Sequence, residues 1–269
     1  MNVVFGAFLS LLIAVSSPLA LAQAQKTPAS SPPASSPPAY EPTSGQEGKD
    51  VVWVPTPQVV VDKMLDMARV TPNDFVMDLG SGDGRTVITA AKRGARAMGI
   101  EYNPDMVELS KRNAAKEGVT AKATFVKADL FETDFSQATV ITMFLLPDIN
   151  LKLRPKILNL KPGTRVVSNS FTMADWKPDE TATLTPQLGC DTSWCTALFW
   201  IVPAKVAGTH KLPKGELVLK QEFQMLAGTF TTEGRTFALE GRVRGEDVSF
   251  KAGGKEYRGR MNGNTFELR

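Results

Sequence analysis

Short apolar runs alternate with helical patterns through the middle of the chain, and this alternation constrains the fold more than any other feature. Runs with the length and side chains of strands lie at 75–79, 97–101, 122–128, 138–144 and 164–169. Segments with the apolar spacing of helices lie at 59–68, 85–92, 105–116 and 151–160. We therefore predict βαβ units, an α/β fold and a mostly parallel sheet, which binds ligands at the carboxyl ends of its strands.

Two later regions differ from this pattern. Two apolar stretches between 183 and 202 have no helix between them and predict an antiparallel pair at the sheet edge. From residue 216 onward, short alternating runs are broken by glycines, and a Gly-Arg-x-x-Gly segment at 241–245 recurs at 259–263. This pattern predicts a small C-terminal all-β meander with repeated strands. We expect two domains, at 51–205 and 211–269.

The N-terminal part is excluded from both domains. Residues 3–22 carry no charge and end in Pro18 and Ala-Leu-Ala at 20–22, the pattern of a secretory signal and its cleavage site. We assign 1–24 to a signal peptide, whose cleavage would export the chain to the periplasm or cell envelope. Left uncleaved, the same segment would anchor the chain in the membrane. Residues 25–50 contain a tandem Ser-Ser-Pro-Pro-Ala repeat and predict an extended linker.

Composition restricts the chemistry that the chain can carry. His210 is the only histidine and there are two cysteines, which excludes a multi-histidine metal site. The sequence indicates no acid or nucleophile that could act as a catalytic partner of His210. We therefore place His210 on the surface between the two domains. With 31 basic and 28 acidic residues, the chain lacks the excess of positive charge that nucleic-acid binding requires. We expect no metal and no nucleic-acid partner.

A glycine-rich turn, Asp-Leu-Gly-Ser-Gly-Asp-Gly at 78–84, ends the first strand and opens the next helix. Glycine lets a ligand lie against the main chain. A dinucleotide site would have glycine at the first, third and sixth positions, whereas the sixth position here is Arg85. Asp78 and Asp83 place negative charge beside the turn, which disfavours a pyrophosphate and suits a cofactor with an ammonium or sulfonium group.

Three motifs at the ends of successive strands resemble the cofactor motifs of class I S-adenosylmethionine-dependent methyltransferases, which have a Rossmann-like seven-strand sheet. They are the glycine turn, Glu101 in Gly-Ile-Glu-Tyr-Asn and Asp129 in Lys-Ala-Asp-Leu-Phe. The resemblance covers about residues 52–203 and implies S-adenosyl-L-methionine as cofactor. By it, Glu101 would accept from the ribose hydroxyls and Asp129 from the adenine amino group, as acceptor-only carboxylates can. The implied cofactor-binding residues are Asp78, Gly80, Ser81, Gly82, Gly84, Glu101 and Asp129.

A narrower likeness is visible within that family. Trp-Val-Pro-Thr-Pro-Gln at 53–58 and Asp-Thr-Ser-Trp at 191–194 are similar to segments of the lysine N-methyltransferases that modify the ATP synthase c-subunit and the adenine nucleotide translocase. This likeness implies a protein lysine as the methyl acceptor. It places Thr56 near the cofactor and the loop 144–148 at the acceptor, where the Asn-Pro-Pro-Tyr sequence of amide and nucleobase N-methyltransferases does not occur. The catalytic candidates are Thr56, Pro147 and Asp148.

Several residues keep two interpretations. Pro147 has either a functional role or only a turn role. Asp148 is the only acid of its loop and either binds a substrate ammonium or is a helix N-terminal carboxylate stabilised by the helix dipole. Cys190 and Cys195 form a disulfide if the chain is exported, or stay as reduced thiols.

Two functions follow from these patterns. The first is a methyltransferase that modifies a protein lysine. The second is an exported cofactor-binding or cell-envelope interaction module without turnover, because S-adenosylmethionine is made in the cytosol. The membrane is a partner only through an uncleaved N-terminal segment.

Overall fold

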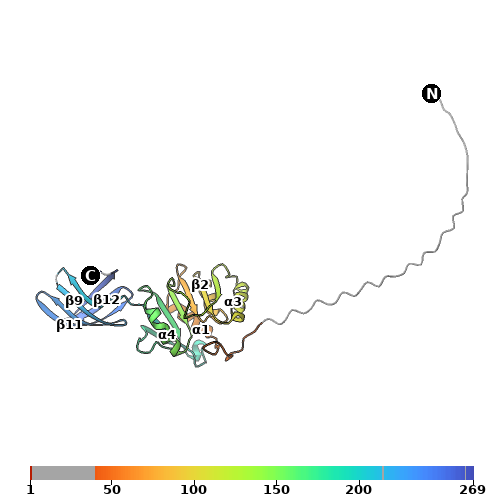
Figure 1. Cartoon of the computed structure of the whole chain (residues 1–269), viewed down its shortest axis with the longest axis horizontal. Coiled ribbons are helices and arrows are strands. Elements are labelled where there is room, and N and C mark those ends of the chain that lie inside the picture. The colour runs from red at the N-terminus through yellow and green to blue at the C-terminus, as the bar shows by residue number, and fades with distance from the viewer. Residues whose placement is uncertain (2–39, 214, 264) are drawn as a thin grey trace. The chain divides into compact units, whose positions relative to one another are not determined.

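The computed structural model describes residues 1, 40–213, 215–263 and 265–269 (Figure 1). The signal peptide predicted at 1–24, apart from its first residue, and the linker up to residue 39 lie outside the described residues. Within the described ranges, no helix has both the length and the apolar content needed to cross a membrane. Tyr40–Arg269 forms one compact unit, which contains two sheets.

The first sheet has seven strands in the order β3-β2-β1-β4-β5-β7-β6. The strands are β1 (Phe75–Leu79), β2 (Arg96–Glu101), β3 (Ala123–Lys127), β4 (Val140–Met143), β5 (Arg165–Asn169), β6 (Glu180–Thr183) and β7 (Thr196–Ile201). Strands β1 to β5 are parallel, and β7 runs antiparallel to both β5 and β6. The predicted α/β sheet with an antiparallel pair at one edge is confirmed.

Four α-helices flank this sheet. They are α1 (Gln58–Met67), α2 (Arg85–Lys92), α3 (Pro104–Lys116) and α4 (Pro147–Leu158), and a short 3₁₀ turn, η1 (Pro186–Leu188), precedes β7. The Asp105 N–H donates to the Oδ1 of Asn103 at 2.9 Å, which caps α3. Helix α4 begins at Pro147 instead of at the predicted residue 151, because proline fits the first turn of a helix, where no N–H is needed.

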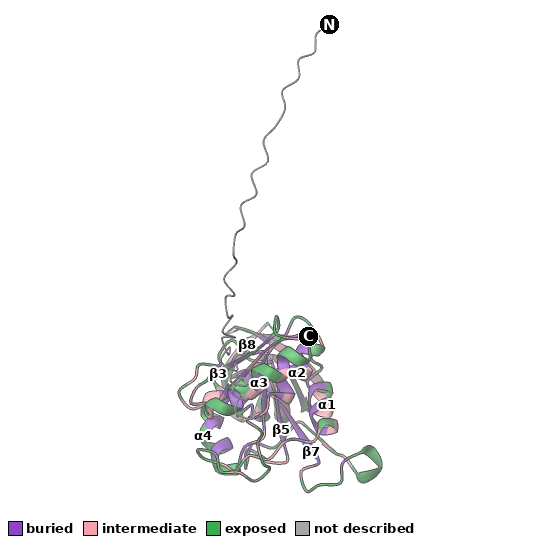
Figure 2. Cartoon of the chain, turned by 90° about the vertical axis from the view of Figure 1, so that its right-hand side faces the viewer, coloured by how far each residue is buried: buried purple, intermediate pink, exposed green. Residues whose placement is uncertain are grey.

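Both faces of the central strands β1, β4 and β5 are buried, and strand side chains alternate between the two faces. Val76, Ala97 and Val140 pack on one face with α1, α2 and α3. Met77 and Ile141 pack on the other face with α4. Figure 2 shows the buried strands between helices with exposed outer sides. Burial on both faces explains why these strands are nearly continuous apolar runs.

The second sheet also has seven strands, in the order β14-β13-β12-β11-β10-β9-β8, and every neighbouring pair is antiparallel. The strands are β8 (Gly208–Leu212), β9 (Gly215–Glu222), β10 (Met225–Thr232), β11 (Arg235–Arg244), β12 (Asp247–Ala252), β13 (Lys255–Asn262) and β14 (Thr265–Leu268). Its first and last strands also contact each other, and one face encloses an apolar core. The predicted C-terminal β-meander is therefore present, while the domain boundaries stay predictions.

His210 lies within β8 instead of in the segment between the two sheets. Its Nε2 lies 2.8 Å from the carbonyl oxygen of Val206, and its ring centroid lies 5.6 Å from that of Phe266. These two contacts give the side chain a structural role, and it is not among the residues that line the cavity described below.

Several contacts join the two sheets. The rings of Trp176 and Phe223 stack with centroids 6.1 Å apart. The Nε2 of Gln224, a buried side chain, donates to the carbonyl oxygen of Lys177 at 2.7 Å. Asp179 forms an ion pair with Arg242 and is almost fully buried, at 2% side-chain exposure. These buried polar contacts fasten the second sheet to the loop that follows β5.

Candidate functional site

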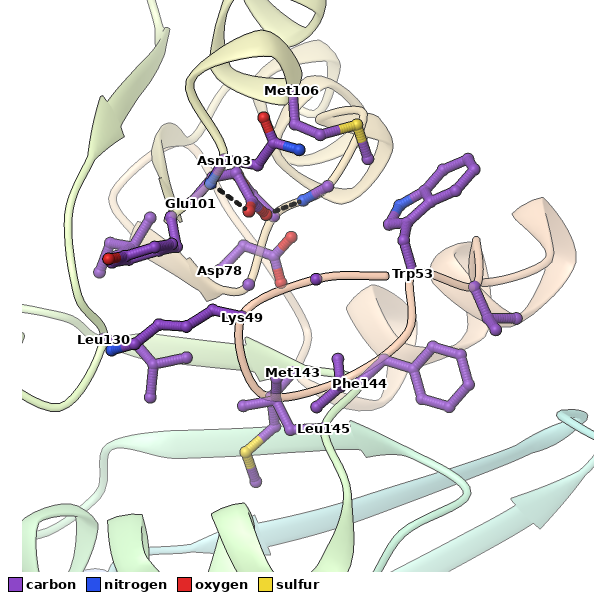
Figure 3. A pocket seen from close by; sticks show the side chains of 18 of the residues that line it. Lys49, Trp53, Asp78, Glu101, Asn103, Met106, Leu130, Met143, Phe144 and Leu145 are labelled. Atoms are coloured by element: carbon purple, nitrogen blue, oxygen red, sulfur yellow. Dashed lines mark hydrogen bonds between the residues drawn. The ribbon is translucent and has the colours of Figure 1, made fainter. Parts of the chain in front are cut away.

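A cavity lies at the carboxyl ends of β1, β2 and β4, where the predicted cofactor motifs converge (Figure 3). Six of the predicted cofactor-binding residues line it: Asp78, Gly80, Ser81, Gly82, Glu101 and Asp129. Residues 46–56, which precede α1, also line the cavity. We call residues 45–57 the strap. The topology therefore brings together residues that the sequence places on three successive strand ends.

The glycine turn is fixed against the end of β2. The N–H groups of Gly80 and Ser81 both donate to the carbonyl oxygen of Ile100, at 2.9 and 3.0 Å. Gly80 and Gly82 have φ angles of 80° and 53°, which L side chains rarely adopt. A Cβ atom at Gly82 would lie only 2.5 Å from the indole Nε1 of Trp53. The indole of Trp53 therefore packs directly against the main chain of the glycine turn.

Gly84 has a different role in the structure. It does not line the cavity but precedes α2 with a φ of 83°. A Cβ atom there would meet the ring of Phe125 at 2.8 Å and the Cβ of Ser110 at 2.9 Å. Close packing between α2, α3 and β3 accounts for this glycine, and its predicted contact with the cofactor stays a prediction.

Glu101 ends β2 with its carboxylate oriented by two backbone donors (Figure 3). The Gly82 N–H donates to Oε2 at 2.8 Å, and the Asn103 N–H donates to Oε1 at 3.0 Å. Each carboxylate oxygen can accept a further hydrogen bond. The side chain is therefore held in a fixed orientation with acceptor capacity left for paired hydroxyl groups.

Asp78 is a buried carboxyl at the start of the glycine turn. Its Oδ1 accepts a hydrogen bond from the hydroxyl of Thr142 at 2.5 Å, and the residue is 6% exposed. Burial, only partly offset by Thr142 and reinforced by the nearby charges of Glu101 and Asp83, raises the pKa of Asp78 to about 7. A cation bound beside it would favour the ionised form, so this carboxyl suits an ammonium group.

Asp129 follows β3 and already has a cationic partner. Its Oδ1 accepts from the Phe131 N–H at 2.8 Å, and its Oδ2 accepts from the ammonium of Lys49, a strap residue. The Lys49 Nζ also lies 4.6 Å from the centroid of the Tyr102 ring. The hydrogen bond from Lys49 lowers the pKa of Asp129. An amine donor therefore occupies the carboxylate predicted to receive the adenine amino group.

Arg85 fastens the strap to the glycine turn. Its Nε and Nη2 donate to the carboxylate of Asp83, at distances from 2.6 to 3.1 Å. Its Nη1 donates to the carbonyl oxygen of Thr56 at 2.8 Å. Thr56 is buried and lines the cavity, and its predicted catalytic role stays a prediction. The departure from the dinucleotide pattern at position 85 thus has a structural reason.

Pro147 and Asp148 do not join this group. Both are exposed in the first turn of α4, and neither lines the cavity. The neighbouring residues Phe144 and Leu145 line it instead. The catalytic roles of Pro147 and Asp148 stay predictions, and the position of Asp148 matches its alternative interpretation as a helix N-terminal acid.

The lining residues fit the predicted cofactor. Asp78, Glu101 and Asp129 offer acceptors for an ammonium, a pair of hydroxyls and an amine. The Ser81 hydroxyl is buried without a hydrogen-bond partner, so a polar ligand could satisfy it. Ile100, Met106, Leu130 and Met143 supply apolar walls. In the part of the chain that the structure describes, no group of three or more His, Cys, Asp or Glu residues could hold a metal ion.

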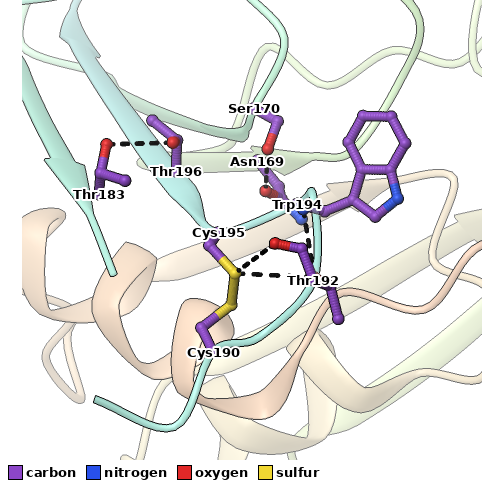
Figure 4. Close-up of a disulfide and its surroundings, with 8 residues drawn as sticks. All are labelled: Asn169, Ser170, Thr183, Cys190, Thr192, Trp194, Cys195 and Thr196. Carbon is purple, nitrogen blue, oxygen red and sulfur yellow. Dashed lines mark hydrogen bonds between the residues drawn. A yellow bond between two sulfur atoms is a disulfide. The ribbon is translucent and has the colours of Figure 1, made fainter. Parts of the chain in front are cut away.

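Cys190 and Cys195 form a disulfide, which resolves the two alternatives for these residues (Figure 4). The bridge closes the loop that carries the Asp-Thr-Ser-Trp segment before β7. The loop residue Thr192 accepts a hydrogen bond from the Trp194 N–H at 3.1 Å.

Comparison with known proteins identifies relatives of the first sheet. The family model described as the ANTKMT methyltransferase domain matches residues 78–180. A protein-lysine N-methyltransferase of Saccharolobus islandicus is 50% identical over 133 residues, which cover 48% of this chain and 83% of that protein. The human lysine N-methyltransferase named for the ATP synthase c-subunit is 37% identical over 143 residues, 53% of this chain and 59% of the human protein.

A solved structure agrees with these matches. An RNA methyltransferase from Salinibacter ruber in complex with S-adenosyl-L-homocysteine is 46% identical, with a TM-score of 0.52, and covers 57% of this chain and 96% of that chain. The matched part of the chain spans less than two thirds of the human relative but most of the archaeal one. The chain belongs to the protein-lysine N-methyltransferase family and is an S-adenosylmethionine-dependent methyltransferase.

Proposed function

We propose that the chain methylates the side-chain amine of lysine in a protein acceptor. The relatives named as lysine N-methyltransferases carry this proposal, and the charge of the cavity agrees with it. Six acidic residues line the cavity: Glu47, Asp50, Asp78, Asp83, Glu101 and Asp129. Among the described residues, its basic lining residues are Lys49 and Arg85, and both are ion-paired with acids of the same cavity. An acidic cavity attracts a cationic amine and repels a phosphate polymer.

The relatives support the same acceptor. The archaeal and human relatives are named as lysine N-methyltransferases, and the name of the human one gives the ATP synthase c-subunit as its acceptor. The Salinibacter structure carries the name of an RNA methyltransferase, so RNA is the acceptor that an experiment must separate from protein. The alternative of a module without turnover gains no support from these relatives.

The residues of the cavity divide the work of binding. When bound, S-adenosylmethionine would supply an electrophilic methyl group on a positively charged sulfur. Asp78 would hold the ammonium of its methionine part, and Glu101 the two ribose hydroxyls. Asp129 would accept from the adenine amino group once Lys49 has moved away. The acceptor lysine would arrive as an ammonium and would lose its proton to water before the neutral amine attacks.

The predicted export of the chain completes the proposal. The uncharged segment at 3–22 and its cleavage pattern support a signal peptide at 1–24, and the disulfide between Cys190 and Cys195 suits an oxidising compartment. The part of the predicted linker at 25–50 that precedes the strap would then tether the methyltransferase part at 51–205 and the β-domain at 211–269. Cell fractionation followed by N-terminal sequencing tests this assignment. A cytosolic chain that keeps its first residues would contradict it.

Label transfer tests the activity. The full chain is incubated with methyl-labelled S-adenosylmethionine and a cell extract, with and without ribonuclease, and labelled proteins are analysed for methyl-lysine by mass spectrometry. We expect label that resists ribonuclease and is lost when Glu101→Ala or Asp129→Asn replaces the wild-type chain. Label that ribonuclease removes, or calorimetric cofactor binding without any transfer, would contradict the proposal.

A further inference from the structure

Three aromatic rings from separate segments meet beside the cofactor cavity. Phe144 follows β4, Phe171 follows β5 and Trp194 precedes β7. The ring centroids of Phe144 lie 5.9 Å from Phe171 and 5.6 Å from Trp194, and those of Phe171 and Trp194 are 5.3 Å apart. All three side chains are only partly buried, and Phe144 also lines the cofactor cavity. We call these three residues the aromatic wall.

The backbone that carries Phe171 is tightly held. Ser170 has a φ of 59°, an uncommon conformation for a residue other than glycine. The carbonyl oxygen of Phe171 accepts from the buried Ser168 hydroxyl at 2.8 Å and from the Nδ2 of Asn150 at 3.2 Å. A strained residue persists only where its surroundings determine it, and such residues cluster at ligand sites. The buried side chains of Ser168 and Asn150 therefore fix the backbone that carries the partly exposed Phe171 ring.

The position of Trp194 is also fixed, by different means. The Cys190–Cys195 disulfide closes its loop, and the Trp194 N–H donates to the Thr192 hydroxyl at 3.1 Å (Figure 4). The Cys195 sulfur lies 3.1 Å from the carbonyl oxygen of Thr192. The hydrogen bonds to the Phe171 carbonyl thus hold one ring against Phe144, and the disulfide loop holds the Trp194 ring there. A cluster that served only to bury apolar surface would not require its rings to stay partly exposed.

An unsatisfied amide lies next to the wall. Asn169, the last residue of β5, is fully buried; its Oδ1 accepts from the Ser170 hydroxyl at 2.8 Å, while its Nδ2 has no hydrogen-bond partner. A buried unpaired donor is costly, and native proteins rarely keep one without a purpose. Because a hydroxyl both donates and accepts, the amide can turn and keep its bond to Ser170. In that orientation its unpaired atom would be a carbonyl oxygen, a group that accepts from an amine.

We propose that the aromatic wall receives the acceptor lysine, with the methylene stem packed on the rings and the amino group directed past Phe144 toward the cofactor. The inference rests on the proposed function. Aromatic faces attract an ammonium and bury aliphatic carbon equally well, so the same surface also suits methylated lysine, which keeps its charge. Phe144 belongs both to the aromatic wall and to the lining of the acidic cavity. A cationic side chain is therefore the occupant that suits both.

Kinetics with poly-L-lysine as the acceptor test the wall. We expect Trp194→Ala and Phe171→Ala to raise the KM for poly-L-lysine by about tenfold or more. Their calorimetric Kd for S-adenosylmethionine should stay within about twofold of the wild-type value, because neither residue lines the cofactor cavity. Trp194→Phe should restore most of the loss, since it keeps an aromatic face. Phe237→Ala, which removes a partly buried ring from the second sheet, is the matched control.

The outcomes separate the wall from the proposed function. Unchanged KM values in both alanine variants would overturn the proposed role of the aromatic wall while leaving lysine methylation intact. A rise in KM that is as large in Trp194→Phe as in Trp194→Ala would do the same. A wild-type chain that binds cofactor but labels neither poly-L-lysine nor a protein of the extract would overturn the proposed function. If only an extract protein is labelled, the same variants are measured with that protein.

Discussion

The ammonium of Lys49 is hydrogen-bonded to Asp129, a carboxylate that lies 80 residues further along the chain and at the end of the third strand. Lys49 belongs to the strap and Asp129 to the predicted adenine site. A lysine of the chain itself therefore takes the place of an amine donor that the cofactor would supply. If the adenine amino group binds Asp129 as predicted, it would compete with Lys49 for the Asp129 carboxylate.

Replacing Lys49 by Met should strengthen cofactor binding. The substitution keeps the aliphatic stem but removes the ion pair that must break, and we expect the Kd for S-adenosylmethionine to fall by about two- to fivefold, as for an exposed pair. Calorimetry at low salt measures the change, and added salt should reduce the difference because it screens the wild-type pair. Lys111→Met, which breaks the exposed pair with Glu108, is the control. Weaker binding in Lys49→Met would show that the strap lysine holds the cofactor.

The buried carboxyl of Asp78 should make cofactor binding depend on pH. With a pKa of about 7, Asp78 keeps its proton at pH 6 and loses it by pH 8. Since only the ionised form pairs with an ammonium, we expect the Kd for S-adenosylmethionine to improve as pH rises through 7, by up to about tenfold per pH unit below that point. Asp78→Asn should bind weakly at every pH and lose this dependence. Calorimetry between pH 5.5 and 8.5 checks both chains; parallel curves would contradict the prediction.

The same carboxyl should lower stability in the cofactor-free protein. In the unfolded chain Asp78 loses its proton near pH 4, whereas the folded chain keeps it until about pH 7. The folded state therefore binds more protons between these values, so the contribution of Asp78 to stability falls as pH rises from 4 to 7. The loss is of the order of 4 kcal/mol, because a tenfold change in proton affinity corresponds to about 1.4 kcal/mol. Urea unfolding should show Asp78→Asn gaining stability relative to wild type over this range.

Much of the fold and the cofactor site followed from local sequence patterns. The apolar runs at β1, β4 and β5 are buried on both faces, so their composition alone distinguishes them from loops. Glu101 and Asp129 could be grouped because carboxyl ends of parallel strands share one edge. The glycine turn was visible because Gly80 and Gly82 adopt backbone angles that other residues avoid.

The acceptor side was harder to predict because it depends on contacts between distant segments. The sequence of the loop predicts roles for Pro147 and Asp148, but α4 begins at Pro147 and leaves both residues exposed. Lys49 lies in the predicted linker, where no local pattern marks its partner at Asp129. The wall joins Phe171 to a tryptophan from another segment, and only the strand order places them together.

Gly84→Ala should destabilise the fold more than an equivalent change at an open glycine. A methyl group at Gly84 would meet Phe125 and Ser110 at less than 3 Å, in addition to the strain of its positive φ. We expect a loss of about 2–4 kcal/mol in the free energy of unfolding, against about 1 kcal/mol for Gly163→Ala, where the φ is 90° but no atom lies within 4 Å. Urea unfolding compares them. Equal losses would mean that backbone strain alone sets the cost.

Two neighbouring ion pairs that join the two sheets should differ sharply in their contribution to the free energy of unfolding. Asp179 is 2% exposed, is paired with Arg242, and accepts the Ile201 N–H at 2.7 Å, whereas Glu180 is 45% exposed and is paired with Arg244. Asp179→Ala leaves a β7 donor and a half-buried guanidinium without their partner, so we expect a loss of about 2–3 kcal/mol. Glu180→Ala breaks a solvated pair and should cost less than about 0.5 kcal/mol. Urea unfolding with both variants measures the contrast. Similar losses would show that the second sheet is held by its apolar contacts, such as Trp176 on Phe223, and not by the buried carboxylate.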